Sequence, residues 1–420
     1  MASEMAQSLR DIITMCEVET RSIQYCSSPF WQCGRRAVFL TASSREGMKA
    51  RIGGNGASGV AERGAKTRGK DGQHPMTRPG VSDKVYRTTK LAAVVDALAE
   101  DGVSVRDALH EVGVPPEELH SPDMLISLKQ LLVACGNAIR LSRKPDLPFR
   151  IGSSIHVSAY GMYGYAILCS TDFRRTMEFC VKYHTLATPL ATIAFAEQGR
   201  SGTWTLDPIL HHAIDERLYR FIVELQMGVH ISLHRDVMGP SFSPREITLA
   251  YPRAADFALT EEMVGCRLRF EQAENQIIFN RKWLNSAANL GNRTTYAAVV
   301  SLCDELLTDI AHRAGMAGKV REGLLLDIAS RPSFASIARA LGTTTRTLRR
   351  QLEHQGTSFR ELTDELRAQI ALRYLRETVM TNEDIAVALG FSDAANFRHA
   401  FRRWTSKTPS HFRLRAGSGT

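Results

Sequence analysis

Apolar residues recur at helical spacing in a short segment near the C-terminal end of the chain. They fall at i, i+3, i+4 and i+7, which predicts a helix that buries one face against a core. These residues are Phe334, Ile337, Ala338 and Leu341. Ser333 is suited to cap the start of this helix, and Gly342 to take the left-handed conformation that ends it. After a run of threonines, Thr344 is the best cap for a second helix that turns Leu348 and Leu352 inward. The segment therefore has a helix-turn-helix pattern.

Three arginines project from the early turns of that second helix if its leucines are buried. They are Arg346, Arg349 and Arg350, and Thr347 lies in the same turn. The first residues of a recognition helix are those that contact base edges in a major groove, and arginine can hold guanine with two hydrogen bonds. A plain surface helix can also carry three arginines, so this feature alone leaves both interpretations open.

A second copy of the pattern follows 48 residues later. Thr381 and Asp384 stand at capping-box spacing, and Gly390 repeats the position of Gly342. The helix after Gly390 is predicted to bury Phe397, Phe401 and Trp404. Polar residues are left on its other faces, namely Asn396, Arg398, His399, Arg402 and Arg403. An apolar stripe over 359–374 predicts a long helix between the two copies, which would hold two recognition helices about one DNA turn apart, roughly 34 Å.

The region from Leu324 to Arg413 resembles the DNA-binding domain of the AraC/XylS transcription regulators. The resemblance rests on IARALGTTTRTLRRQLEHQGTSFRELTDELR, ALRYL and IAVALGFSDAANFRHAFRRWTSKTPSHFR, in that order. It implies an all-α domain with two helix-turn-helix units over 323–415. By position, Arg346, Arg349 and Arg350 match the first recognition helix of the family, and Ala395, Asn396 and His399 match the second. Ala395 replaces a residue that is often polar, which implies weaker base contacts from the second helix.

Composition and charge agree with a globular protein that binds a polyanion. The chain has 420 residues, a hydrophobic fraction of 44% and a formal net charge of +9. No apolar run approaches the roughly 18 residues of a membrane span. The eight cysteines form no C-x-x-C pair, so we expect neither a zinc cluster nor a disulfide framework. Cysteines without such a framework fit the reducing bacterial cytoplasm, which is the expected location. Cys169 and Cys180 are expected to be ordinary buried thiols.

The first 80 residues differ from the rest. The stretch from Arg51 to His74 is rich in Gly, Lys and Arg and nearly lacks large apolar residues, which predicts disorder. Our hypothesis is that Met76 is the natural start and that residues 1–75 are an upstream extension. A basic arm that adds DNA affinity is the alternative.

Residues 85–290 are predicted to form a mixed α/β domain, which makes the whole chain α+β. Helical patterns come first, a glycine-rich turn is expected at AYGMYGYAILCS, and strands are predicted in ATIAFAEQG, SGTWTLDP, EITLAY and RLRFEQAENQIIF. The region resembles the arabinose-binding-like N-terminal domain of one branch of the same family. That resemblance implies a small-molecule sensor or dimerisation domain, without specifying arabinose. Residues 291–322 are expected to link it to the C-terminal domain, with a Gly-rich, basic joint from His312 to Gly323.

Aromatic residues beside glycines are the candidates for an effector site. They are Tyr160, Tyr163, Tyr183 and His184, although each could simply pack in the core. His230 and His234 stand at i, i+4, but without a neighbouring Glu this is a weak metal signal, as is the pair His211 and His212. We predict no metal and no cofactor. No catalytic motif of the hydrolase, P-loop or dinucleotide-binding type is present, so we do not expect an enzyme.

The sequence thus predicts a DNA-binding transcription regulator, of the activator type, controlled by a small organic effector. Its partners would be operator DNA, RNA polymerase and, in a homodimer, a second copy of the chain. The residues expected to contact DNA are Arg346, Thr347, Arg349, Arg350, Asn396, Arg398, His399, Arg402 and Lys407. Lys407 and Arg413 are expected to contact phosphates. A central domain that only dimerises, or an enzyme with a DNA-binding tail, are the alternatives. The effector, the target genes and the oligomeric state stay open.

Overall fold

The computed structural model of the protein describes residues 79–253, 257, 261–326 and 328–413. The described residues belong to one compact unit, 71–420. The expected disordered extension over 1–80 and its alternative, the basic arm, lie almost entirely outside the described residues.

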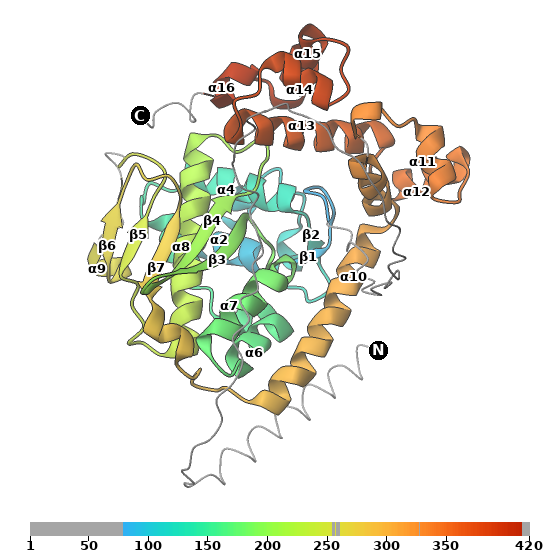
Figure 1. The fold of residues 1–420 in the computed structure, drawn as a ribbon. Helices are drawn as coiled ribbons and strands as arrows, with labels where there is room; N and C mark the ends of the chain where they lie inside the picture. Colours follow the sequence, from blue (N-terminus) through green and yellow to red (C-terminus); the bar gives the residue numbers. More distant parts are fainter. Residues whose placement is uncertain (1–78, 254–256, 258–260, 327, 414–420) are drawn as a thin grey trace, which may run out of the picture. The chain divides into compact units, whose positions relative to one another are not determined.

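The first part of this unit combines helices with a sheet (Figure 1). Its helices are α2 (Thr89–Glu100), α3 (Val105–Ala108), α4 (Leu128–Leu141), α5 (Leu147–Ser153), α6 (Gly161–Cys169), α7 (Phe173–Lys182), α8 (Glu216–Met238) and α9 (Glu261–Val264). Short 3-10 turns are η1 (Pro116–Glu118), η2 (Val157–Tyr160), η3 (His184–Ala187) and η4 (Arg281–Asn285). The strands are β1 (Tyr86–Arg87), β2 (Leu125–Ile126), β3 (Ala191–Gln198), β4 (Ser201–Pro208), β5 (Glu246–Thr248), β6 (Arg267–Arg269) and β7 (Gln276–Asn280).

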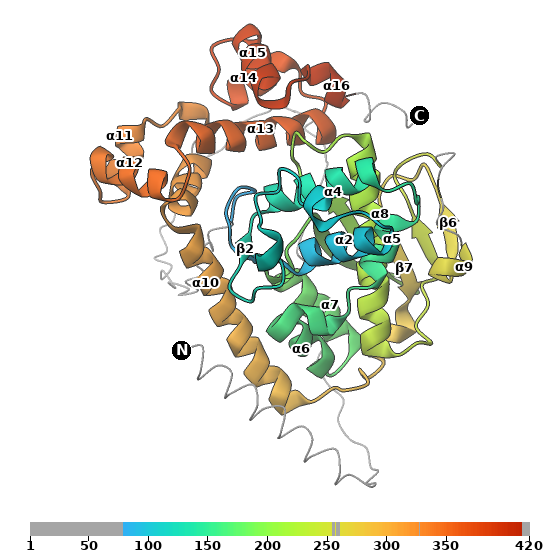
Figure 2. The same cartoon turned by 180° about the vertical axis from the view of Figure 1, so that it is seen from behind.

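Five of these strands form one mixed sheet in the order β3-β4-β7-β5-β6. All neighbours are antiparallel except β5 and β6, which are parallel. In β4 the predicted alternation is confirmed, because Trp204 and Leu206 are buried while Thr203 and Thr205, which alternate with them, are half-buried. Helix α8 contacts β3 and β4, and Figure 2 shows α2 and α5 beside α8. The mixed α/β prediction for this region is therefore confirmed.

One local prediction was wrong: the segment AYGMYGYAILC is not a glycine-rich turn. It forms η2 and then helix α6. Gly161 has φ of 54° and ends the 3-10 turn, whereas Gly164 lies inside the helix. A Cβ on Gly164 would come 1.8 Å from the carbonyl oxygen of Val157. Glycine is thus required at position 164 for close packing and not for a turn.

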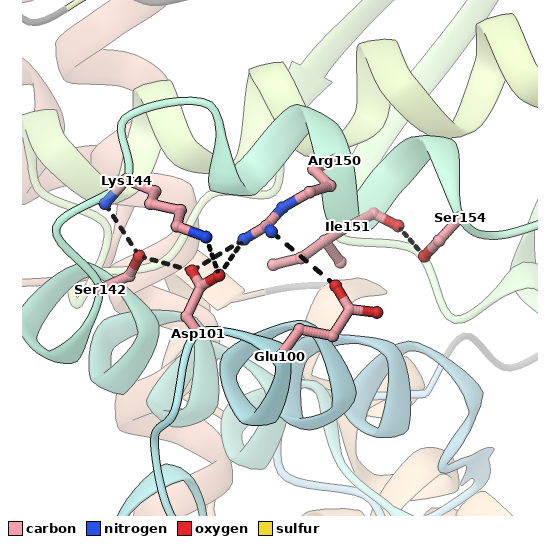
Figure 3. Close-up of polar contacts among 7 residues, drawn as sticks. All are labelled: Glu100, Asp101, Ser142, Lys144, Arg150, Ile151 and Ser154. Carbon is pink, nitrogen blue, oxygen red and sulfur yellow. Dashed lines mark hydrogen bonds and ion pairs between the residues drawn. The ribbon is translucent and has the colours of Figure 1, made fainter.

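A buried carboxylate ties three helical segments together at the end of α2 (Figure 3). Arg150 Nη2 donates to both oxygens of Asp101, at 2.8 and 2.7 Å, and Lys144 Nζ lies 2.8 Å from Asp101 Oδ1. Ser142 donates to the same carboxylate at 3.2 Å. Burial raises the pKa of Asp101, but the hydrogen bonds from Arg150 and Lys144 outweigh burial and hold the pKa below its usual value.

Replacing Asp101 with Asn should lower the free energy of unfolding by about 2–3 kcal/mol. The amide carries no charge, so Arg150 loses the nearer of its two carboxylate partners and keeps only Glu100, at 3.8 Å. Urea unfolding at pH 7 measures the change. Asp96→Asn is the matched control. The Asp96 side chain is 60% exposed, and its contact with His120 is long, at 3.8 Å, so this variant should change the free energy of unfolding by less than about 0.5 kcal/mol. Equal losses in the two variants would contradict this account.

The segment expected to be the linker is helical. Helix α10 (Arg293–Leu326) runs through it with a kink at Gly315, where φ is 56° and ψ is −140°. Gln355 holds the kink: its Oε1 accepts from the backbone N–H of Ala317 at 2.8 Å, and its Nε2 donates to the carbonyl of Ala314 at 3.4 Å. A glycine is required at the kink because φ is positive there and a Cβ would collide with Gln355.

The C-terminal region is all helical, as predicted. It contains η5 (Ile328–Ser330), α11 (Phe334–Ala340), α12 (Thr345–His354), α13 (Phe359–Glu377), α14 (Asn382–Ala388), α15 (Ala394–Thr405) and α16 (Pro409–Arg413). One hydrophobic cluster joins the end of α10 to α11, α12 and the first half of α13. A second joins the rest of α13 to α14, α15 and α16. The prediction of two helix-turn-helix units held by one long helix is confirmed.

Among the helices of the described ranges, none combines the length and the apolar character needed to cross a membrane.

Candidate nucleic-acid interface

The first helix-turn-helix unit follows the predicted caps. Ser333 accepts from the N–H of Ser336, Gly342 has φ of 65°, and Thr344 accepts from the N–H of Thr347. These caps begin α12 at Thr345, with Leu348 and Leu352 buried against α10 and α13. The opposite face of α12 is therefore left to solvent.

Arginines occupy the exposed face of α12 in two different ways. Arg346 and Arg350 are exposed, and no hydrogen bond or ion pair holds either one within the described residues. The guanidinium of Arg349 lies 5.7 Å from the ring centre of Phe334 and lines a groove of about 310 Å³. Thr347 is half-buried, and its hydroxyl accepts from Thr344 at 3.0 Å. Arg346 and Arg350 are thus the two arginines whose donors are available to a ligand.

The second unit repeats this arrangement on α15. Thr381 and Asp384 form the predicted capping box of α14, and Asp393 caps α15. Arg398, His399 and Arg402 are exposed. Four nearby polar side chains already have partners.

Asn396 donates to Ser392 at 2.8 Å and to Asp393 at 2.7 Å, while Arg403 donates to Asp364 of α13 at 3.1 Å. Lys407 Nζ lies 3.1 Å from His411 Nε2. Arg413 donates to Asn382 at 3.2 Å. Trp404, expected to be buried, is only half-buried, although its ring nitrogen is enclosed and unpartnered among the described residues.

A cleft of about 510 Å³ lies between the two units and was not foreseen from the sequence. Arg331 and Arg367 lie 5.8 and 5.4 Å from the ring centre of Phe391, and both line the cleft together with His399 and Arg403. Burial, reinforced by the charge of Arg331, lowers the pKa of Arg367. Two cations held close together on one aromatic ring provide a site for an anion such as a backbone phosphate. These residues lie in separate elements, so no spacing rule connects them.

In the central region the candidate tyrosines belong to one aromatic cluster. The rings of Tyr160 and Tyr163 are 5.8 Å apart, Tyr163 lies 5.5 Å from Phe179, and Phe179 stacks on Tyr183 at 4.4 Å. The hydroxyl of Tyr183 donates to Asp304 at 2.8 Å. His184 faces another way, with Nε2 2.7 Å from the carbonyl oxygen of Ala191. The four candidates are therefore neighbours, but they do not all face one point.

The histidines and cysteines noted in the sequence are mostly buried. His230 and His234 lie inside α8 with ring centres 6.1 Å apart, and burial lowers the pKa of both. No group of three or more potential metal ligands occurs among the described side chains. Cys169 and Cys180 are buried, and burial raises the pKa of Cys180 to about 12.

A short segment at the start of the described chain contacts the helices of the C-terminal region. Asp83 forms an ion pair with Arg321 of α10, and the backbone N–H of Val81 donates to Glu365 of α13 at 3.0 Å. The Arg321 side chain is 8% exposed and that of Asp83 13%, so both charges are withdrawn from water. No local pattern indicates this pairing, because 238 positions separate the two residues.

Comparison with known proteins agrees with both halves of this description. Residues 102–287 match the arabinose-binding domain of AraC transcription regulator, N-term, and residues 337–415 match a helix-turn-helix domain. The ornithine utilization regulator of Pseudomonas aeruginosa is 31% identical over 324 residues, which are 76% of this chain and 94% of that protein. The transcriptional regulator VqsM of the same organism is 24% identical over 311 residues, or 72% and 92% of the two chains. The solved structure of CdpR from Pseudomonas aeruginosa aligns at 21% identity with a TM-score of 0.42, covering 78% of this chain and 98% of that one.

The two domain matches follow each other in the order that the helix-turn-helix repeats and the mixed α/β region had implied. The ornithine utilization regulator is similar over nearly its whole length. On these grounds the chain belongs to the AraC family of transcriptional regulators, with an arabinose-binding-like N-terminal domain and a DNA-binding helix-turn-helix region.

Proposed function

We propose that the protein is a cytoplasmic transcription activator whose contact with operator DNA and RNA polymerase is controlled by a small organic effector. In this proposal residues 85–290 hold the effector, 291–322 connect, and 323–415 bind DNA. The observation that carries it is the pair of capped, solvent-facing helices α12 and α15, fixed on α13 by two separate hydrophobic clusters. Similarity to an ornithine utilization regulator favours the control of small-molecule metabolism.

Arg346 and Arg350 are proposed to contact bases, because both are exposed on the first turns of α12 and have no partner among the described residues. Arg349, Arg398, His399 and Arg402 are proposed to support them. Thr347, Asn396 and Lys407 already have hydrogen-bond partners, so their part in DNA binding requires them to exchange these partners. Arg331 and Arg367 are proposed to grip a phosphate between the two boxes of the site.

Replacing Arg350 with Ala should weaken binding to the operator, meaning the DNA site enriched when the protein selects from random sequences, by about 1–3 kcal/mol. The preference at one base pair of that site should also relax. The reason is the loss of a two-bond contact to a base edge. Fluorescence anisotropy at one fixed salt concentration measures the affinity of each variant for the operator and for random DNA. Arg373→Ala, at an exposed position of α13, is the matched control. An equal loss on operator and random DNA would assign Arg350 to a phosphate.

Control by an effector requires a contact that differs between two arrangements of the chain, since equal affinity for both shifts nothing. We propose that the ion pair between Asp83 and Arg321, together with the Val81–Glu365 hydrogen bond, is such a contact. It joins the segment preceding α2 to the two helices that carry the first helix-turn-helix unit. We propose that effector binding is transmitted to the DNA-binding helices through it.

A further inference from the structure

Six polar side chains gather inside the central region between α2, α8 and the sheet. We call Lys90, Tyr160, His184, Trp204, His230 and His234 the core polar cluster. Five of its atoms are buried and have no hydrogen-bond partner within the described chain: Tyr160 Oη, His184 Nδ1, Trp204 Nε1, His230 Nε2 and His234 Nδ1. Four of its residues are at least nine-tenths buried, namely Lys90, Trp204, His230 and His234.

The members of the core polar cluster are neighbours although they come from different elements. Lys90 Nζ lies 5.8 Å from the ring centre of Tyr160. The ring of Trp204 lies 5.2 Å from that of His230 and 6.1 Å from that of His234. The pKa of His230 is lowered by burial and then by its neighbours His234, His184 and Lys90. The unpartnered atoms therefore occupy one continuous zone of the core.

Such a concentration is costly for a purely structural core. A buried polar atom without a partner costs about 1–3 kcal/mol, and native proteins tolerate only a few per 100 residues. Five such atoms lie in this one zone, and the described protein supplies no partner for any of them, so a small polar molecule in the zone would satisfy groups that the chain leaves open.

Hydrogen-bond chemistry restricts what that molecule is. His184 Nε2 faces the carbonyl oxygen of Ala191, which can only accept, so Nε2 carries the proton and Nδ1 is an acceptor. Trp204 Nε1 can only donate. Lys90 gives two N–H groups to the carbonyls of Ala187 and Thr188, at 2.8 and 2.9 Å, and retains a third. A ligand must therefore supply acceptors to Lys90 and Trp204 and a donor to His184.

The surroundings restrict its charge and size. No carboxylate is among the groups that act on the pKa of the titrating members of the cluster, so a cationic amine would find no counter-ion. Phe173 and Phe242 close one side, with ring centres 5.1 and 5.2 Å from that of His234. Because these rings pack directly against His234, a ligand in the zone has to be compact.

We propose that the core polar cluster binds a compact hydroxy acid, with its carboxylate toward Lys90, Tyr160 and Trp204 and its hydroxyl donating to His184. This inference rests on the proposed effector control and names the chemical class of the effector. It differs from the cluster around Tyr163 and Tyr183, whose hydroxyls have partners in Cys180 and Asp304.

The pH dependence of binding provides a secondary check. Burial lowers the pKa of Lys90 to about 7, and a bound carboxylate raises it again, so affinity should fall as the pH rises above 7. The titratable groups that face Lys90 are Cys135 on α4, Tyr160 before α6, His184 in η3 and His230 on α8. Burial keeps all four neutral near pH 7.

Thermal unfolding of the full chain with three matched three-carbon probes tests the ligand class. Lactate has both groups, propionate lacks the hydroxyl, and propane-1,2-diol lacks the carboxylate. Glycolate and malate extend the series, and putrescine tests cations. We expect at least one hydroxy acid to raise the Tm by about 5–10 °C at a hundredfold excess over its Kd, and its matched analogues to have little effect. No shift with any hydroxy acid, or equal shifts with lactate and propionate, would overturn the proposal.

Two tyrosine variants test the location. Tyr160→Phe removes a buried hydroxyl that has no partner, so it should raise the Tm of the free protein by about 2–4 °C and reduce the hydroxy-acid shift. Tyr251→Phe is the matched control: its buried hydroxyl donates to Glu224 at 3.2 Å, so the variant should have a lower Tm and an unchanged shift. An undiminished shift in Tyr160→Phe would overturn the assignment of the site.

DNA binding of the same samples separates this inference from the proposed function. A hydroxy-acid shift without sequence-specific DNA binding supports the site and contradicts the regulator. Normal DNA binding without any shift overturns the site alone.

Discussion

Replacing Gly152 with Ala is expected to lower the free energy of unfolding by about 3 kcal/mol or more. Gly152 lies in α5 where this helix crosses α8, opposite Gly228. A Cβ on Gly152 would come 2.0 Å from the carbonyl oxygen of Leu225 and 2.8 Å from the backbone nitrogen of Val229. Both obstacles are backbone atoms of α8, which cannot rotate away as a side chain would. The two helices would have to separate, and that would open the core beneath them.

Gly136→Ala is the matched control for this prediction. Gly136 also lies inside a helix, α4, but nothing stands within 4 Å of the position its Cβ would take. Alanine is the better helix former, so this variant should gain up to about 1 kcal/mol. Urea unfolding measures the free energy of unfolding of the two variants, which should fall for Gly152→Ala and rise for Gly136→Ala. Gly152→Ala as stable as the parent protein would show that α5 and α8 do not cross as closely as described.

Lowering the pH from 6.5 to 5 is expected to remove about 4–6 kcal/mol of stability, which approaches the whole stability of an ordinary domain. Burial lowers the pKa of His211 and His234 to about 3 in the folded protein, and it lowers that of His230 well below 6.5. The unfolded chain takes up protons below pH 6.5, whereas the folded chain does not. The loss is therefore absent above pH 6.5 and grows until the pH reaches the folded-state pKa, by about 1.4 kcal/mol per pH unit for each histidine.

Urea unfolding followed by tryptophan fluorescence at pH 8, 6.5 and 5 measures this dependence. His234→Phe should reduce the slope by about one histidine, because the ring is replaced by one of similar shape among Phe173, Phe242 and Trp204. His120→Gln, whose side chain is 68% exposed, should leave the slope unchanged. Stability that stays constant from pH 6.5 to 5 would mean that these imidazoles take up protons in the folded protein as readily as in the unfolded chain.

The helices of the C-terminal region were predictable because their signals are local. Ser333, Thr344 and Thr381 lie three residues before the N–H groups they cap, and the apolar stripes repeat within one helix. The availability of the recognition residues was not predictable in the same way. Asp364, which engages Arg403, comes from α13, and only the packed structure brings it near.

The central region shows where local signals fail. Helix α6 was missed because glycine suggests a turn, whereas Gly164 is needed for contact with Val157. Lys90 had a visible signal, since it shares a helical face with Val94 and Ala97, and a lysine on an apolar face calls for a buried partner. Trp204 had none, because only the packed structure brings its ring near His230 and His234. His184 was a candidate from its aromatic neighbours, but no periodicity relates it to Trp204.

We propose that two recognition helices on one rigid helix contact one composite DNA site. The most direct test is a selection of random DNA by the full chain at fixed salt, followed by anisotropy on the enriched site and on sites with 2 and 5 extra base pairs between its halves. We expect an enriched motif of two boxes about one helical turn apart, roughly 34 Å, and a loss of affinity with either insertion. A single box, or affinity that is indifferent to the insertions, would contradict it.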